Sequence, residues 1–188
     1  MNLPNKLTLF RIILVPVMVI VSFFDIPGSF LGISTTMWIM ELIFIIASIT
    51  DKLDGYLARK NNQVTDFGKV MDAIADKILV NGVLIIMACN GLLPTIIPVI
   101  IVLRDTFVDS IKMVASSKNG KAVGASKAGK IKTACMMLGL ALMFFSNLPF
   151  ELFGFSIGYY FVIIACVFSV YSGIQYFMVN KEALTKKL

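Results

Sequence analysis

The chain has 188 residues, of which 58% are hydrophobic and only 15% are charged. A soluble domain carries about a quarter charged residues, so this composition argues against a soluble protein and for one membrane domain over residues 1–188. The net charge of +6 would suit nucleic acid, but basic residues on one membrane face fit anionic headgroups and phosphorylated substrates better. We therefore expect no nucleic-acid partner.

Six long apolar runs follow one another along the chain, centred near residues 17, 44, 84, 101, 140 and 167. With their partly polar ends included, each has about 18–25 residues, enough to cross a hydrocarbon core of about 30 Å. We expect the second helix to run from about Thr35 to Arg59 and the third to begin near Asp66. The sequence thus predicts an all-α fold, a bundle of six transmembrane helices.

The 17 Lys and Arg residues all fall on one side of this predicted bundle. The connections at residues 24–37, 89–97 and 146–156 contain none of them. By the positive-inside rule, both termini and the two basic connections face the cytoplasm.

Two pairs of acids flank the connection between the second and third predicted helices. Asp51 and Asp54 are three residues apart, and Asp72 and Asp76 are four apart. On a helix, either spacing places both side chains on one face. Both pairs lie at cytoplasmic helix ends, so the four carboxylates can converge.

Four carboxylates in a partly desolvated pocket require a cation among them, because like charges repel. The chain contains no His, and its three Cys are dispersed. Without these ligands of zinc and copper, the acids form an all-oxygen site suited to Mg²⁺ or Mn²⁺. A pair of such ions could hold the attacking and leaving oxygens of a phosphoryl displacement. The simplest proton acceptor would also be an Asp.

Small and polar residues accompany the acids. Gly55, Ala58 and Gly68 remove side-chain bulk, so that a nucleotide diphosphate or a neighbouring helix can approach closely. Arg59 offers a planar fork for phosphate oxygens, and Thr65 offers a hydroxyl. Helix packing alone would explain the glycines, but their position beside four Asp favours a binding site.

The complete pattern, Asp-x2-Asp-Gly-x2-Ala-Arg-x8-Gly-x3-Asp-x3-Asp from Asp51 to Asp76, resembles the signature of the CDP-alcohol phosphotransferase family. This resemblance implies two Mg²⁺ or Mn²⁺ ions per active site. It also implies that Asp76 both ligates metal and accepts the proton of the incoming alcohol. The implied metal ligands are Asp51, Asp54, Asp72 and Asp76.

The same resemblance implies binding of CDP-diacylglycerol in a homodimer of the bacterial inner membrane, with the active site facing the cytoplasm. The family's Asn-x-x-Thr element, which approaches the cytidine, is similar to Asn5-Lys-Leu-Thr8, although a helix start would also explain these two residues. The residues implied to bind this substrate are Asn5, Thr8, Gly55, Ala58, Arg59, Thr65 and Gly68.

The family signature leaves the acceptor alcohol open. Residues 2–11, Arg104-Asp105 and residues 129–133 resemble the family members that use glycerol 3-phosphate. We therefore predict transfer of a phosphatidyl group to glycerol 3-phosphate with release of CMP; inositol phosphate, phosphatidylglycerol and serine are the alternative acceptors. The acceptor's own phosphate needs cations, although membrane topology would also explain them. The candidates are Arg104, Lys112, Lys130 and Lys132.

Two other classes of membrane protein use similar acids. A prenyltransferase uses paired Asp motifs and Mg²⁺, and the spacing of Asp105 and Asp109 does not exclude it. A cation transporter would place acids near the midplane, where Glu41 is the one candidate, whereas the motif acids gather at one face.

Overall fold

The computed structural model describes residues 2–61, 63–119, 127–146 and 156–185, and this part of the chain forms six helices and one short hairpin. Strands β1 (Ser29–Phe30) and β2 (Ile33–Ser34) pair antiparallel between the first two helices. The all-helical class is confirmed, whereas the hairpin is not predicted by the sequence. The helices are α1 (Leu3–Ser22), α2 (Thr35–Lys60), α3 (Asp66–Cys89), α4 (Ile96–Asn119), α5 (Lys127–Phe144) and α6 (Ile157–Thr185).

The predicted starts of α2 and α3 agree with the structure because each start has a side-chain cap. Ser34 precedes α2, and its hydroxyl accepts a hydrogen bond from the Met37 N–H at 3.3 Å. Thr65 precedes α3, and its hydroxyl accepts from the Gly68 N–H at 3.0 Å. Such caps satisfy N–H groups that have no partner inside the helix. They fix the two helix ends that carry the acidic pairs.

Helices α3 and α4 extend beyond their apolar runs. The runs are centred near residues 84 and 101, but α3 already begins at Asp66 and α4 continues to Asn119. Within the described residues, two segments are long and apolar enough to cross a membrane by composition, namely Leu3–Ser22 and Ile157–Lys181. Six crossings, with both termini in the cytoplasm, stay a prediction.

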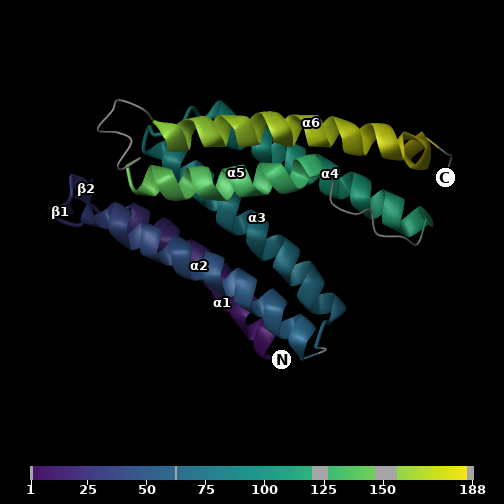
Figure 1. The fold of residues 1–188 in the computed structure, drawn as a ribbon, viewed down its shortest axis with the longest axis horizontal. Helices are drawn as coiled ribbons and strands as arrows, with labels where there is room; N and C mark the ends of the chain where they lie inside the picture. Colours follow the sequence, from purple (N-terminus) through teal and green to yellow (C-terminus); the bar gives the residue numbers. More distant parts are fainter. Residues whose placement is uncertain (1, 62, 120–126, 147–155, 186–188) are drawn as a thin grey trace.

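Successive helices run in opposite directions (Figure 1). Helix α1 packs against α2 and α3, and α6 packs against α4 and α5. The start of α1 lies beside the junction of α2 and α3, whereas the hairpin lies at the other end of α1 and α2. Most of the predicted connection at residues 146–156, and the chain after residue 185, lie outside the described residues. The packing of α1 against α2 and α3 brings the start of α1, the end of α2 and the start of α3 together at the acidic motif.

One apolar core joins α1, α2, α3, α5 and α6, and α4 adds Ile97 and Ile101 to it. Helices α5 and α6 approach each other closely at Gly139 of α5. A Cβ atom there would lie 2.9 Å from the carbonyl oxygen of Gly158 and 2.9 Å from a methyl group of Val162 in α6. Only a glycine permits this approach of the two backbones.

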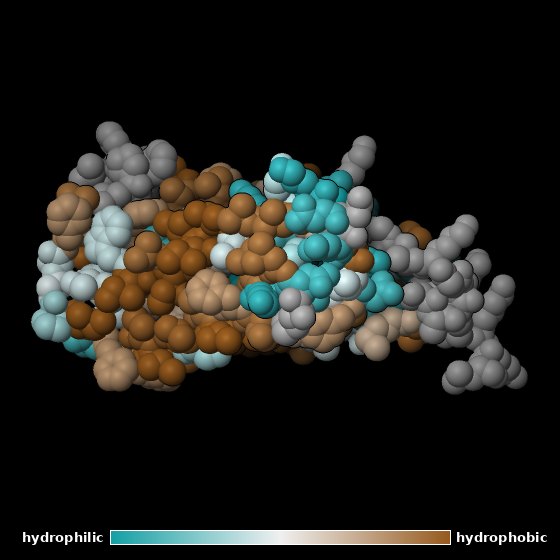
Figure 2. All heavy atoms as spheres, turned by 90° about the horizontal axis from the view of Figure 1, so that it is seen from below, coloured by the Kyte–Doolittle hydropathy of each residue, from teal (hydrophilic) through white to brown (hydrophobic). Residues whose placement is uncertain are grey.

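Large apolar side chains also cover much of the outside. Leu103 is 65% exposed, Val167 is 63% exposed and Val179 is 78% exposed. Figure 2 shows one face on which apolar atoms dominate, with hydrophilic atoms gathered toward one end. An apolar surface of this extent indicates contact with lipid or with another protein.

Candidate functional site

One face of α1 points inward and changes in character along the helix. Near the start of the helix, this face carries a proline and two polar residues, and further along it carries apolar residues. The buried residues are Pro4, Thr8, Arg11, Val15 and Met18, which recur at helical spacing. The polar end of this face therefore meets the ends of α2 and α3 that carry the acids.

Arg11 lies at the centre of the acidic motif. Its side chain is fully buried, and Nη1 lies 2.7 Å from Asp51, 3.3 Å from Asp72 and 2.6 Å from Asp76. Its Nη2 lies 2.5 Å from Oδ2 of Asp54. The sequence requires a cation among the four acids, and in this structure Arg11 is that cation. A single guanidinium offsets one of the four negative charges, so the cluster keeps an excess of negative charge.

Three of the four predicted metal ligands form a close group. Asp51, Asp72 and Asp76 each have a carboxylate oxygen within 4.8 Å of the oxygens of the other two. The three residues offer carboxylate oxygens, which are the ligands that Mg²⁺ and Mn²⁺ prefer, and Nη1 of Arg11 contacts the same three residues. The donor set therefore fits such an ion.

The fourth acid, Asp54, is held by two residues of α1. It is 3% exposed, and its Oδ2 accepts hydrogen bonds from the Thr8 hydroxyl at 2.8 Å and from Arg11 Nη2 at 2.5 Å. Charged hydrogen bonds of this kind fix a carboxylate strongly. Asp54 therefore links the acidic cluster to the neighbouring cavity.

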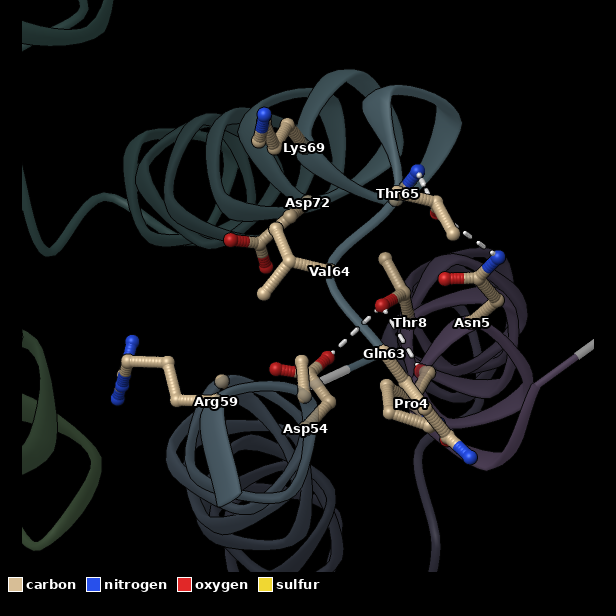
Figure 3. A pocket seen from close by; sticks show the side chains of 13 residues that line it. Pro4, Asn5, Thr8, Asp54, Arg59, Gln63, Val64, Thr65, Lys69 and Asp72 are labelled. Carbon is tan, nitrogen blue, oxygen red and sulfur yellow. Dashed lines mark hydrogen bonds between the residues drawn. The ribbon is translucent and has the colours of Figure 1, made fainter. Parts of the chain in front are cut away.

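A cavity of about 290 Å³ opens beside the acids. Figure 3 shows that its labelled side chains come from the start of α1, the end of α2, the connection that follows α2 and the start of α3. All seven residues predicted to bind CDP-diacylglycerol line it, together with Asp54 and Asp72. The lining residues that the sequence did not single out are Pro4, Gln63, Val64 and Lys69.

Gly68 is a point of close contact in this cavity. The Asn5 side-chain N–H donates to the Thr65 hydroxyl at 3.4 Å, which joins α1 to the start of α3 (Figure 3). A Cβ atom at Gly68 would lie 2.7 Å from Oδ1 of Asn5 and 2.9 Å from the Thr65 hydroxyl. The absence of a side chain at Gly68 therefore allows α1 and α3 to meet here.

We expect Thr8→Val to lower the free energy of unfolding by about 1–3 kcal/mol, because the buried Asp54 carboxylate loses a hydrogen-bond donor while the side-chain shape is kept. Thermal denaturation of the purified protein measures the change. Thr133→Val is the matched control, because the exposed Thr133 hydroxyl donates only to a carbonyl of its own helix, at 3.1 Å. Equal effects of the two substitutions would contradict a specific role for the Thr8 hydroxyl.

The cations predicted to bind the acceptor phosphate do not form one group. Lys132 Nζ lies 2.7 and 2.8 Å from the two carboxylate oxygens of Asp105, and Arg104 Nη1 lies 2.7 Å from one of them. Lys112 instead lies over the Tyr176 ring, 5.2 Å from its centre, and Lys130 is exposed. Thus Arg104 and Lys132 meet at a shared, buried carboxylate, whereas Lys112 and Lys130 form no ion pair with this carboxylate in the described part of the chain.

The position of Arg11 among the acids was not predicted from the sequence, where Arg11 belongs to the basic residues and to the segment 2–11 that resembles family members using glycerol 3-phosphate. Its spacing contains a usable signal, since Arg11 follows Thr8 by three residues and Pro4 by seven. On a helix, these three residues share one face. The Asn-x-x-Thr element could therefore have been extended to Arg11.

Comparison with known proteins identifies the class of protein. The sequence model of the CDP-alcohol phosphatidyltransferase family matches residues 1–171. A relative from Bacillus subtilis is 40% identical over 188 residues, which covers 97% of each chain. A relative from Haemophilus influenzae is 36% identical, with 97% of this chain and 95% of the relative covered. The chain therefore belongs to the CDP-alcohol phosphatidyltransferase family, as the signature between Asp51 and Asp76 predicts.

Both of these relatives carry the name CDP-diacylglycerol–glycerol-3-phosphate 3-phosphatidyltransferase. A relative from Mycoplasma genitalium has the same name and is 32% identical over 93% of this chain and 82% of its own length. The similarity to enzymes of this name thus extends over nearly the whole chain.

Proposed function

We propose that the protein transfers the phosphatidyl group of CDP-diacylglycerol to sn-glycerol 3-phosphate, giving phosphatidylglycerophosphate and CMP. The main support for this proposal is that residues of the family signature line one cavity, with the three grouped carboxylates beside it. The relatives named for this reaction support the choice of acceptor. Their similarity covers α3 to α6, which would supply the acceptor's binding site, as well as the signature.

In the proposed reaction, Asp76 accepts the proton of the acceptor hydroxyl. The hydroxyl oxygen then bonds to the phosphorus that carries the diacylglycerol, and the bond from this phosphorus to the oxygen of CMP breaks. Divalent ions held by Asp51, Asp54, Asp72 and Asp76 would neutralise the charge that develops on the phosphate oxygens.

The proposed binding of CDP-diacylglycerol uses the cavity beside the acids. Arg59, exposed at the rim, would pair with the diphosphate, and Gly55 and Ala58 leave room for it. Asn5 and Thr8 would face the cytidine end. Holding both reactants in place and stabilising charge would supply most of the acceleration.

We place the phosphate of glycerol 3-phosphate near the Asp105 cluster. Arg104 and Lys132 bring two positive charges to one carboxylate, so the cluster has a net positive charge that suits a phosphate dianion. Lys112 and Lys130 would add to this charge.

The proposal includes six membrane crossings in a bacterial inner membrane, with the acidic end in the cytoplasm and residues 1–188 as one domain. The alternating direction of the helices supports it, as does the gathering of hydrophilic atoms toward one end (Figures 1 and 2). A homodimer through the transmembrane helices is also proposed. Exposed apolar side chains such as Ile85 and Leu103 support it.

The test uses detergent-purified protein with CDP-diacylglycerol, Mg²⁺ and one candidate alcohol at a time, followed by measurement of CMP and of the lipid product. We expect product with glycerol 3-phosphate alone, and no product after EDTA treatment until Mg²⁺ or Mn²⁺ is restored. Product with inositol phosphate, phosphatidylglycerol or serine instead would retain the family reaction and overturn the acceptor. No CMP with any alcohol would overturn the enzymatic proposal.

A further inference from the structure

Arg11 occupies the position that the acids would offer to a metal. Its Nη1 bonds the same three side chains, Asp51, Asp72 and Asp76, whose carboxylate oxygens form the close group. No part of this guanidinium reaches the surface, because the Arg11 side chain is 0% exposed. The cation and the candidate metal site therefore share one set of three carboxylates.

A divalent ion and Nη1 cannot both bind the carboxylate oxygens that Nη1 contacts. Mg²⁺ binds oxygen at about 2.0–2.1 Å and requires a nearly octahedral arrangement around it. Nη1 already lies 2.6 to 3.3 Å from the three carboxylates, and its positive charge would repel the ion at that distance. An ion that binds the three acids through those oxygens must therefore displace Nη1.

The structure leaves the guanidinium a second attachment. Nη2 bonds Asp54, which lies outside the close group of three acids and is itself held by the Thr8 hydroxyl. The Nε atom is buried and has no hydrogen-bond partner among the described residues. Only the two terminal nitrogens therefore fix the group, and Nη1 can withdraw while Nη2 stays on Asp54.

We infer that Arg11 is a built-in counter-cation that holds the acidic cluster together without metal and competes with divalent ions for it. The inference rests on the metal site of the proposed function. It makes Arg11 a positioning residue with two effects: it stabilises the metal-free protein, and it weakens metal binding. Removing its charge should change these two properties in opposite directions.

The test compares wild-type protein with Arg11→Gln and Arg11→Lys, without lipid substrates. Electron paramagnetic resonance titration with Mn²⁺ measures the dissociation constant, and thermal denaturation in EDTA and in Mn²⁺ measures stability. Arg59→Gln is the matched control: it removes the same charge next to the cavity, and Arg59 forms no ion pair with the four acids in the described structure.

For Arg11→Gln we expect Mn²⁺ to bind about tenfold or more tightly than in the wild type, a factor that corresponds to the loss of one charge-assisted hydrogen bond. In EDTA, its unfolding temperature should fall below that of Arg59→Gln, and Mn²⁺ should restore it. Arg11→Lys keeps the positive charge, but on a shorter side chain with one ammonium nitrogen in place of the two terminal guanidinium nitrogens. Its Mn²⁺ affinity should therefore lie between those of Arg11→Gln and the wild type. If Arg11→Gln does not fold, Arg11→Lys alone tests the competition.

Equal Mn²⁺ affinity in wild-type protein and in the folded Arg11 variants would overturn the competition and leave the proposed metal site standing. If Arg59→Gln bound Mn²⁺ more tightly by the same factor, the competition would be overturned too, because the loss of any positive charge near the cavity would then explain the tighter binding. Absence of Mn²⁺ binding in every form would remove the metal site itself, and the inference with it.

Discussion

Replacing Asp76 with Asn is expected to reduce CMP release roughly 10²–10⁴-fold, the range that a general base contributes. Asn keeps the size of the side chain but cannot accept the proton. The Asp76 side chain is 54% exposed, so its loss should disturb the fold little. Release of CMP at saturating CDP-diacylglycerol and glycerol 3-phosphate is the measurement.

Two further variants separate the proposed roles of the acids. Asp66→Asn changes an acid at the exposed start of the same helix, bonded only to Lys69 in the described structure, and should leave the rate unchanged. Asp51→Asn removes a proposed metal ligand but no base, so high Mg²⁺ should partly restore its activity. Similar recovery of Asp76→Asn in high Mg²⁺ would show that Asp76 acts only as a ligand.

The largest effect on stability is expected from Asp105→Ala. The change leaves the buried Lys132 ammonium without its two carboxylate contacts and removes the Arg104 ion pair. Breaking a buried pair from one side costs about 3–5 kcal/mol, because an uncompensated charge stays behind. Thermal denaturation in detergent should show the loss directly.

A double substitution gives this prediction its control. Asp105→Asn together with Lys132→Met removes the carboxylate and the ammonium together, and it should recover part of the stability lost in Asp105→Ala. Asp66→Ala breaks the exposed ion pair with Lys69 and should have no measurable effect. If Asp105→Ala behaves like Asp66→Ala, the buried cluster does not stabilise the fold.

The sequence predicts those features that depend on neighbours along the chain. The starts of α2 and α3 follow from hydropathy and caps at Ser34 and Thr65, which act within three residues. The pairing of the acids on helix faces likewise follows from their spacing. Local physics is sufficient for these elements.

The features that were missed depend on packing between distant segments. Arg11 bonds Asp54, Asp72 and Asp76 across 43, 61 and 65 residues of sequence, so no local pattern shows that its charge turns inward. In the same way, the spacing of Lys132 does not show that Asp105, 27 residues away, holds it. The sequence therefore identified the cations but could not tell which are already paired.

The inward side of α1 has a consequence for the order in which the protein is assembled. An arginine near the middle of a membrane helix costs about 2.5–3.5 kcal/mol to insert. The carboxylates that compensate Arg11 arrive with α2 and α3, and the set is complete only when residue 76 has been synthesised. In the proposed membrane topology, the first helix would therefore enter the bilayer carrying a charge that its later neighbours neutralise, and stable insertion of α1 would coincide with completion of the proposed active site.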